Sequence, residues 1–297
     1  RFVCLLFGLS FLGGEMKAQQ KSAHETGLRS KSTSELAELE QVITKVNYDE
    51  SKVPVYTLPD VLTLTNGRKV TTKKEWVEKR RPELLRLFET QIYGKAPVRS
   101  KDLHFRLLNE DREALGGLAT RKEVAVYLTK DEKHYLTVLM YLPNRRKGTV
   151  PMFFGINFKG NHAIHPDEGI TFPSEERMIA YGRKRMFPRG SAASRWPVEM
   201  LMEHGYGLAT FYRGDIDPDF DDGFQNGVHP LYYKKGQTRP AEDEWGTLAA
   251  WAWGMSCAMD YFETDKDIDA KRIAIFGHSR LGKTTLWAGA IDPRFAL

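Results

Sequence analysis

Short hydrophobic segments alternate with longer, helix-like segments along the second half of the chain. The apolar runs "PMFFGINF" (151–158), "YGLATFY" (206–212) and "RIAIF" (272–276) have the length and composition of buried strands. Helical patterns follow these runs in turn, over 196–204, 242–263 and 282–290. This alternation predicts an α/β fold with a mostly parallel sheet flanked by helices, and it places ligands at the carboxyl ends of the strands.

The region before this alternation has a different pattern. Apolar-rich runs separated by turn-like residues, between residues 103 and 143, predict an antiparallel start to the sheet. Upstream of them, hydrophobic residues recur at helical spacing between Thr72, a candidate N-cap, and Gly94, the expected stop. Pro82 lies inside this pattern, and we expect it to divide the segment into two helices.

The N-terminus has the features of an export signal. Arg1 is followed by a 13-residue apolar run, which is too short to cross a bilayer but typical of a secretory signal. We expect residues 1–20 to be a signal peptide, residues 21–54 a polar linker with a short helix around 34–46, and residues 55–297 the folded domain. The protein would then be secreted or periplasmic, with no stable membrane insertion after cleavage. A short lipid anchor or a buried helix is the alternative.

Composition and charge narrow the class of protein. The 297 residues are 41% hydrophobic and 28% charged, which is typical of a globular protein, and the net charge is +5. Lysine and arginine are scattered among apolar residues, so we expect no nucleic-acid partner. Of the two cysteines, Cys4 falls in the predicted signal, and Cys257 alone cannot form an intramolecular disulfide. We expect Cys257 to pack on a helix.

The stretch "RIAIFGHSRLGKTTLWAGA" (272–290) fits two incompatible chemistries. Its residues Gly277, Gly282, Lys283 and Thr284 match the phosphate-binding P-loop pattern G-x-x-x-x-G-K-[ST]. Gly277 and Ser279 match the nucleophile elbow, in which a sharp turn between a strand and a helix exposes a serine. Both patterns need a strand before the motif and a helix after it, so the predicted elements alone do not separate them.

The surrounding sequence favours the elbow. A P-loop needs another strand ending in an acidic residue to position magnesium, and no such strand fits into the 13 residues that follow Thr284. The residues "HSRL" (278–281) also contain no glycine that would let the backbone wrap a phosphate. The elbow departs from the usual G-x-S-x-G pattern, because Leu281 stands two residues after the serine and Gly282 follows one place later. A plain helix-capping role for Ser279 stays open.

The motif "GHSRLGK" (277–283) resembles the G-[C/H]-S-R-x-G-K signature of the glucuronoyl esterases, which are carbohydrate esterases with an α/β-hydrolase fold. The segments "NFKGNH" (157–162), "DEWGTLAAWAWGMSCAMDY" (243–261) and "DPRFAL" (292–297) resemble their bacterial members, and the similarity covers roughly residues 55–297. The resemblance implies a three-layer αβα sandwich. It also implies hydrolysis of the ester that joins (4-O-methyl-)glucuronic acid of xylan to lignin alcohols.

Roles for individual residues follow from this resemblance. It implies that Ser279 is the nucleophile, that Arg280 stabilises the oxyanion, and that Lys283 contacts hydroxyls of the uronate ring. His278 stands where fungal relatives have a disulfide-forming cysteine. No cofactor or metal is implied, and the expected partner is a glucuronoxylan or lignin-carbohydrate ester substrate.

The order of catalytic residues in an α/β-hydrolase gives a further expectation. The acid and then the histidine follow the serine in that fold, but the 18 residues after Ser279 contain one acid, Asp292, and no histidine. All eight histidines precede the serine, and its neighbour His278 is poorly placed to accept its proton. We therefore expect the sequence to be a fragment whose acid and histidine lie beyond Leu297, and we expect residues 1–297 alone to be inactive.

Two groups of residues are similar to metal sites. His162, His165 and Asp167 share a short loop, and we expect them to shape that loop rather than bind a metal. The acidic run 215–226 begins like a calcium loop, but Phe220 stands at the position that needs glycine. We expect this run to form a solvated rim of the pocket.

Three functions stay open on the sequence. The first is the glucuronoyl esterase, the second is a related secreted esterase such as an acetyl xylan esterase, and the third is a non-catalytic carbohydrate-binding relative. Trp245, Trp251 and Trp253 could stack on sugars, but they lie in an apolar helical segment. We therefore expect these tryptophans to build the core.

Overall fold

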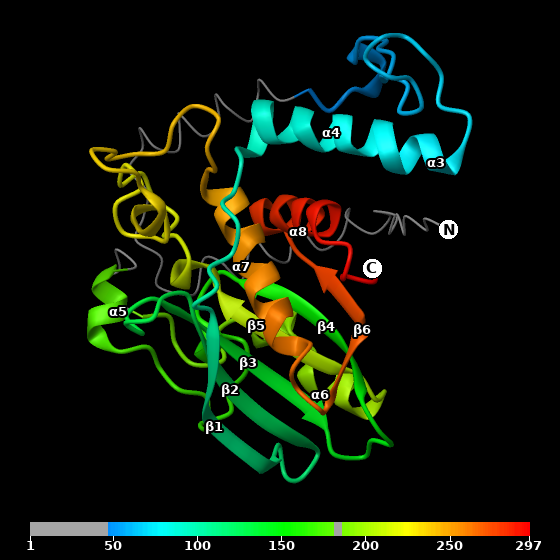
Figure 1. The fold of residues 1–297 in the computed structure, drawn as a ribbon. Coiled ribbons are helices and arrows are strands. Elements are labelled where there is room, and N and C mark those ends of the chain that lie inside the picture. The colour runs from blue at the N-terminus through cyan, green and yellow to red at the C-terminus, as the bar shows by residue number, and fades with distance from the viewer. Residues whose placement is uncertain (1–46, 181–185) are drawn as a thin grey trace. The chain divides into compact units, whose positions relative to one another are not determined.

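The computed structural model describes residues 47–180 and 186–297 (Figure 1). The chain divides into two units, residues 1–60 and residues 61–297. The described part of the first unit holds a short 3-10 helix, Glu50–Lys52, which Asp49 caps. The predicted signal peptide and the helix around 34–46 lie outside the described residues. Within the described ranges, no helix is long and apolar enough to cross a membrane.

A mixed sheet forms the centre of the second unit. Its described strands are β1 (His104–Ala114), β2 (Ala119–Tyr127), β3 (Tyr135–Pro143), β4 (Val150–Asn157), β5 (Gly207–Tyr212) and β6 (Ile268–Phe276). They lie in the order β1-β2-β3-β5-β4-β6. The pairs from β1 through β3 to β5 are antiparallel, as predicted for the first strands. Parallel pairing is confined to β5, β4 and β6, so the sheet is mixed rather than mostly parallel.

Helices cover both faces of this sheet (Figure 1). On one face lie α7 (Thr247–Phe262) and α8 (Arg280–Ile291), and on the other lies α6 (Val198–Glu203). Side chains of a strand point alternately to its two faces. Accordingly, Val138 and Met140 of β3 pack in the core beneath α7, while Leu139 packs in the core beneath α6. The result is a three-layer αβα arrangement.

The long helix α7 is apolar on nearly every side because it lies in the core. Trp251, Trp253 and Cys257 are buried in it, and Trp245, just before the helix, is also buried. The Trp245 and Trp253 rings meet edge to face with centroids 5.5 Å apart. The predicted core positions of the tryptophans and of Cys257 are confirmed.

The helical segment from Lys73 to Tyr93 corrects one prediction. Thr72 caps it by accepting a hydrogen bond from the Glu75 backbone N–H, and Gly94 ends it with a φ of 78°, both as predicted. Pro82, however, does not divide it: α3 (Lys73–Glu75), a π-helical turn (Trp76–Arg80), α4 (Arg81–Phe88) and a second π turn (Glu89–Tyr93) follow without a break. The wider π turn before the proline accommodates its ring and its missing N–H.

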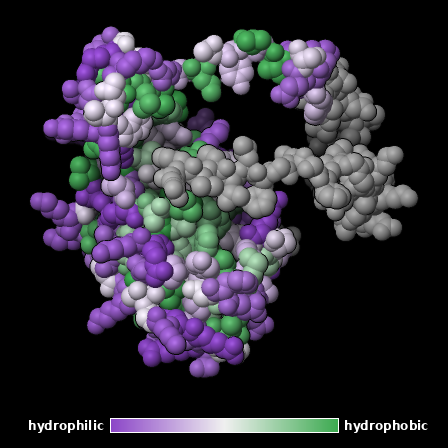
Figure 2. All heavy atoms as spheres, turned by 90° about the vertical axis from the view of Figure 1, so that its right-hand side faces the viewer, coloured by the Kyte–Doolittle hydropathy of each residue, from purple (hydrophilic) through white to green (hydrophobic). Residues whose placement is uncertain are grey.

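The last residues, Ala296 and Leu297, run beside β6. The Ala296 backbone N–H donates to the Ile273 carbonyl oxygen at 2.9 Å, and the Ile275 N–H donates to the Leu297 carbonyl oxygen at 2.7 Å. Arg294 fixes the turn before them through ion pairs with Asp292 and Asp260 and with Glu263. Figure 2 shows the face on which β6 lies, with hydrophobic residues gathered in its middle and hydrophilic ones around them.

Candidate active site

Ser279 occupies a sharp turn between a strand and a helix. β6 ends at Phe276, α8 begins at Arg280, and Ser279 stands between them as the N-cap with φ 55° and ψ −129°. A residue other than glycine rarely adopts a positive φ, and such strain gathers at functional sites. The described structure therefore has the geometry expected of a nucleophile elbow.

Two glycines allow this turn to be so tight. A Cβ atom on Gly277 would lie 2.3 Å from the Leu281 carbonyl oxygen, and one on Gly282 would lie 3.3 Å from the Gly277 carbonyl oxygen. Leu281, two residues after the serine, is buried in the core. The close approach therefore falls at Gly282, which explains why the second glycine stands one place later than in the usual pattern.

Ser279 does not act as the cap of α8. Its side chain makes no capping hydrogen bond to the first turn, although it holds the N-cap position. A capping serine accepts a hydrogen bond from one of the unpaired backbone N–H groups in the first turn of the helix. The hydroxyl is exposed instead, so the capping role left open by the sequence is not the one the geometry favours.

The P-loop interpretation does not fit the hydrogen bonds of the turn. The Leu281 N–H donates to the His278 carbonyl oxygen, and the Lys283 N–H donates to that of Ser279. A P-loop keeps such backbone donors for phosphate oxygens. Thr284, which would bind magnesium, is fully buried, and its hydroxyl donates to the Arg280 carbonyl oxygen.

Ser279 opens onto a cleft of about 500 Å³ at the carboxyl ends of β4 and β6. Its other walls include the last residues of β4 with the loop that follows, residues 156–160, and residues from the segment 191–196. Lys159, Arg195 and Arg280 line the cleft, and no aspartate or glutamate is among its described lining residues. The cleft thus presents positive charge to a bound molecule.

The loop after β4 is held rigidly by amide side chains. The Asn157 side chain donates to Asn161 Oδ1 at 2.8 Å and to Thr210 Oγ1 at 3.1 Å, and its own oxygen accepts from the Gly160 N–H. Gly160 has a φ of 102°, and a Cβ there would meet the His162 ring. The sequence singled out "NFKGNH" (157–162) by resemblance, without a role, and the structure sets residues 157–160 in the same cleft as Ser279.

Arg280 lines two cavities. One is the Ser279 cleft, and the other is a space of about 430 Å³ walled by Pro218–Asp222, Phe224, Leu248 and Trp251. The Arg280 guanidinium lies 2.5 Å from Asp219 Oδ2, and the same oxygen forms an ion pair with Arg213 at 3.2 Å. Its backbone N–H is the first of α8, so it has no acceptor within the helix.

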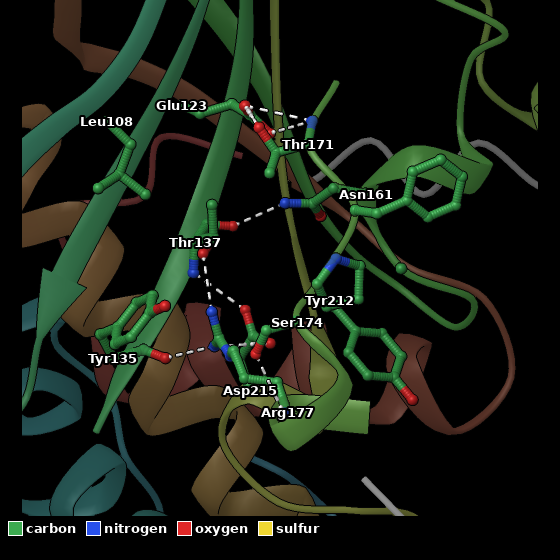
Figure 3. A pocket seen from close by; sticks show the side chains of 13 residues that line it. Leu108, Glu123, Tyr135, Thr137, Asn161, Thr171, Ser174, Arg177, Tyr212 and Asp215 are labelled. Atoms are coloured by element: carbon green, nitrogen blue, oxygen red, sulfur yellow. Dashed lines mark hydrogen bonds and ion pairs between the residues drawn. The ribbon is translucent and has the colours of Figure 1, made fainter. Parts of the chain in front are cut away.

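A second pocket is bordered by Gly160 and Asn161, just after β4 (Figure 3). Its charged groups point at partners within the protein rather than at the cavity. Arg177 donates to the Thr137 hydroxyl and pairs with Asp215 at 3.0 Å, and Glu123 accepts from the Thr171 hydroxyl at 2.6 Å. These bonds tie segment 171–177 to the sheet, which makes the pocket part of the scaffold.

The residues considered as metal ligands all have protein partners. His162 donates to the Phe187 carbonyl oxygen, His165 lies 2.8 Å from Glu199, and Asp167 binds Arg121. In the parts of the chain that the structure describes, no three His, Cys, Asp or Glu residues are arranged to hold a metal.

The acidic run after β5 is more deeply placed than predicted. Asp217 is only 2% exposed and lies 3.3 Å from His229, and Asp215 pairs with Arg177. The prediction of a solvated rim is therefore wrong for Asp217. The ion pair with Arg177 offsets the cost of burying Asp215.

Burial by itself would raise the pKa of Asp167. Hydrogen bonds from Tyr141, Arg121 and the Gly169 N–H outweigh this effect and hold the pKa below its usual value. The same burial and the Asp167 contact raise the pKa of Tyr141. This cluster fixes the loop that leads away from the cleft wall.

A general base for Ser279 is not found among residues 47–180 and 186–297. His278 lines the same cleft, but its ring packs edge-on against Phe158, and the hydrogen bonds of the described residues include none between a histidine and Ser279. Lys283 is exposed one turn further along α8, and no ion-pair partner for its ammonium lies in the described ranges.

The mixed sheet, its helical layers and the serine turn between β6 and α8 define an α/β-hydrolase-like protein. The family described as "Glucuronyl esterase, fungi" matches residues 199–297. The chain is also 51% identical over 258 residues to a carbohydrate esterase from an unknown prokaryotic organism, covering 84% of this chain and 59% of that protein. Over most of its length the chain is similar to glucuronoyl esterases of carbohydrate esterase family 15.

Solved structures agree with this assignment. A glucuronoyl esterase from Solibacter usitatus superposes with a TM-score of 0.78 at 45% identity, over 83% of this chain and 63% of that one. A promiscuous family 15 esterase from a marine bacterial metagenome gives a TM-score of 0.72 at 50% identity, over 84% and 64%. The chain thus spans about three fifths of the length of these relatives.

Proposed function

We propose that the protein hydrolyses the ester between the carboxyl group of (4-O-methyl-)glucuronic acid on xylan and an alcohol of lignin, with Ser279 as nucleophile. The observation that carries this proposal is the uncapped, exposed Ser279 at a positive φ, beside the N-terminus of α8 and facing a cationic cleft. A curated relative from Phanerochaete chrysosporium, 32% identical over 139 residues, is named 4-O-methyl-glucuronoyl methylesterase. The match covers 43% of this chain and 28% of that protein. The name of this relative supports a 4-O-methyl-glucuronoyl ester as the substrate class.

In the first step, Ser279 Oγ attacks the carbonyl carbon while its proton passes to a base, and the carbonyl oxygen becomes an oxyanion. The Arg280 backbone N–H and guanidinium are the proposed donors to it, together with a backbone N–H of the loop after β4. Each fixed donor contributes about 3 kcal/mol to transition-state stabilisation.

In the second half of the reaction, the tetrahedral intermediate expels the alcohol, which takes up a proton. A uronoyl ester on Ser279 remains. Water then attacks this ester, the carboxylate leaves, and the Ser279 hydroxyl is restored. The esterified carboxyl group of the substrate is neutral, so Lys159 and Arg195 in the cleft wall favour the negative charge that develops on the uronoyl group and remains on the released uronate.

Hydrolysis of methyl glucuronate by the full-length protein tests the proposal. Ser279→Ala should abolish activity, and a phosphonate ester probe should label Ser279 in the wild type, as seen by peptide mass mapping. Ser51→Ala, an exposed serine in the other unit, is the control and should keep full activity. Activity on acetylated xylan with none on methyl glucuronate would instead identify an acetyl esterase.

We infer also that the protein is secreted or periplasmic. The basic start and the apolar run of residues 1–20 support this localisation. N-terminal sequencing of the mature protein should find residues 1–20 removed, and an intact leader would contradict the inference.

A further inference from the structure

One carboxylate connects the core of the protein to the residue after the candidate nucleophile. Asp219 Oδ2 lies 3.2 Å from Arg213 Nη2 and 2.5 Å from Arg280 Nη1. The exposure of the three side chains rises in this order along the chain of contacts, from 9% for Arg213 through 21% for Asp219 to 51% for Arg280. Asp219 therefore links a buried guanidinium to a half-exposed one.

The buried end of this chain is held firmly. The Arg213 guanidinium lies within 6 Å of the rings of Phe158, Tyr212 and Trp251. Arg213 begins the 3-10 turn directly after β5, a strand that is buried over its whole length. Asp219 is thus paired with one guanidinium that has little freedom to move.

The exposed end needs such an anchor. Arg280 is the first residue of α8, and its side chain would otherwise rotate freely in water over several bonds. A donor stabilises a transition state only when it is already oriented toward the developing charge. Arg280 lines both the Ser279 cleft and the neighbouring cavity. The orientation of its side chain therefore determines in which of these two spaces its positive charge acts.

We propose that Asp219 is a positioning residue, which holds the Arg280 guanidinium at the wall of the Ser279 cleft. This inference rests on the proposed function, since it assigns to Arg280 a part in stabilising the oxyanion. Asp219 itself does not touch the substrate. With one carboxylate between two guanidinium groups, the cluster keeps a net charge of +1, which leaves attraction for an anion in the cleft.

The inference predicts that the two simplest substitutions of Asp219 lower activity to different extents. Asp219→Asn keeps a hydrogen-bond acceptor but loses the charge, while Asp219→Ala loses both. A charge-assisted hydrogen bond is roughly twice as strong as a neutral one. We therefore expect Asp219→Asn to retain part of the wild-type kcat and Asp219→Ala to retain less.

The experiment measures kcat and KM for methyl glucuronate in the full-length protein and its variants. Asp219→Ala should lower kcat about tenfold and change KM less than twofold, and Asp219→Asn should fall between. Asp221→Ala removes an exposed carboxylate from the same loop and should leave both constants within twofold. Thermal unfolding of each variant shows whether a loss of activity reflects a loss of folded protein.

A double-mutant cycle separates positioning from a general effect of the loop. In the Arg280→Ala background, Asp219→Ala should cause no further loss, because its only proposed route runs through Arg280. An equal loss in both backgrounds would overturn the proposal, and so would a rise in kcat, which would mean that the ion pair withholds Arg280. A wild-type protein without esterase activity, or an active Ser279→Ala variant, would refute the proposed function itself and is distinguishable from these outcomes.

Discussion

Ser279 and Lys283 lie one helical turn apart at the start of α8, joined by a 3.2 Å hydrogen bond from the Lys283 backbone N–H to the Ser279 carbonyl oxygen. The Cα–Cβ bonds of a helix tilt toward its N-terminus, which for Lys283 is the serine end of α8. The side chain is exposed, and its ammonium has no ion-pair partner among the described residues. Lys283 is not among the described residues that line the Ser279 cleft, so its contact with a substrate ring stays a prediction.

Lys283→Met should distinguish a uronate esterase from a general one. If Lys283 binds hydroxyls of the uronate ring, the substitution should lower kcat/KM for methyl glucuronate at least about tenfold, or 1.4 kcal/mol. A small acetate ester has no such ring, and its kcat/KM should stay within about twofold. Steady-state kinetics on the two substrates measures the ratio.

Two other outcomes have clear meanings for Lys283. An unchanged kcat/KM on both substrates would mean that the lysine interacts only with solvent. An equal loss on both would mean that it supports the turn at Ser279 rather than the sugar. Lys271→Met, an exposed lysine on β6, is the matched control and should leave both activities unchanged.

Arg280→Ala should affect every ester substrate. An oxyanion forms whatever acid is esterified, so both methyl glucuronate and a small acetate ester should lose activity, about a hundredfold and mainly in kcat. Arg272→Ala removes an exposed arginine that pairs with Asp269 on β6 and serves as the control. A loss confined to KM would assign Arg280 to substrate binding instead.

Much of the fold could be predicted because its signals are local. β5 is buried at every position and α7 at nearly every one, so composition and length alone identify them. The strand order could not be predicted, because the placement of β5 between β3 and β4 depends on pairing between distant segments. The unbroken helix at Pro82 was also missed, since a π turn leaves no signal in hydrophobic spacing.

Some features of the candidate site could likewise be predicted from the sequence, and others could not. The turn at Ser279 was visible because the glycines that permit it, Gly277 and Gly282, lie within six residues of the chain. The pairing of Asp219 with Arg280 spans 61 residues, and no local pattern indicates it. The only signal was an acidic run after β5, which by itself is typical of solvated surface.

Gly277→Ala should disrupt the elbow. The reason is steric, because the backbone φ at residue 277 is one that other residues can also adopt. The added Cβ would lie 2.3 Å from the Leu281 carbonyl oxygen and 2.5 Å from Thr285 Oγ1, and the first of these is backbone that cannot move aside. We expect the free energy of unfolding to fall by about 2–3 kcal/mol. Gly289→Ala, within the helix α8 that follows the turn, meets only the end of the Ile275 side chain and should be neutral or stabilising. Urea unfolding compares the two, and equal stabilities would contradict the steric argument.

Asp167→Asn should make stability less sensitive to acid. Burial would raise the pKa of Asp167, but hydrogen bonds from Tyr141 and Arg121 bring it below its usual value. A carboxylate whose pKa is lower in the folded protein stabilises it above the unfolded pKa of about 4, and this stabilisation is lost as pH falls through the folded-state pKa.

At pH 7 the variant should be less stable than the wild type by about 3 kcal/mol, because the 5% exposed Arg121 loses the closer of its two charged partners and keeps only Asp111 at 3.6 Å. Below pH 4 the difference should shrink, since protonated Asp167 resembles asparagine in charge and shape. Urea unfolding from pH 7 to pH 3 measures it, with Glu168→Gln, an exposed neighbour, as the control. A difference that stays constant over this range would mean that the hydrogen bonds of Asp167, and not its charge, hold the loop.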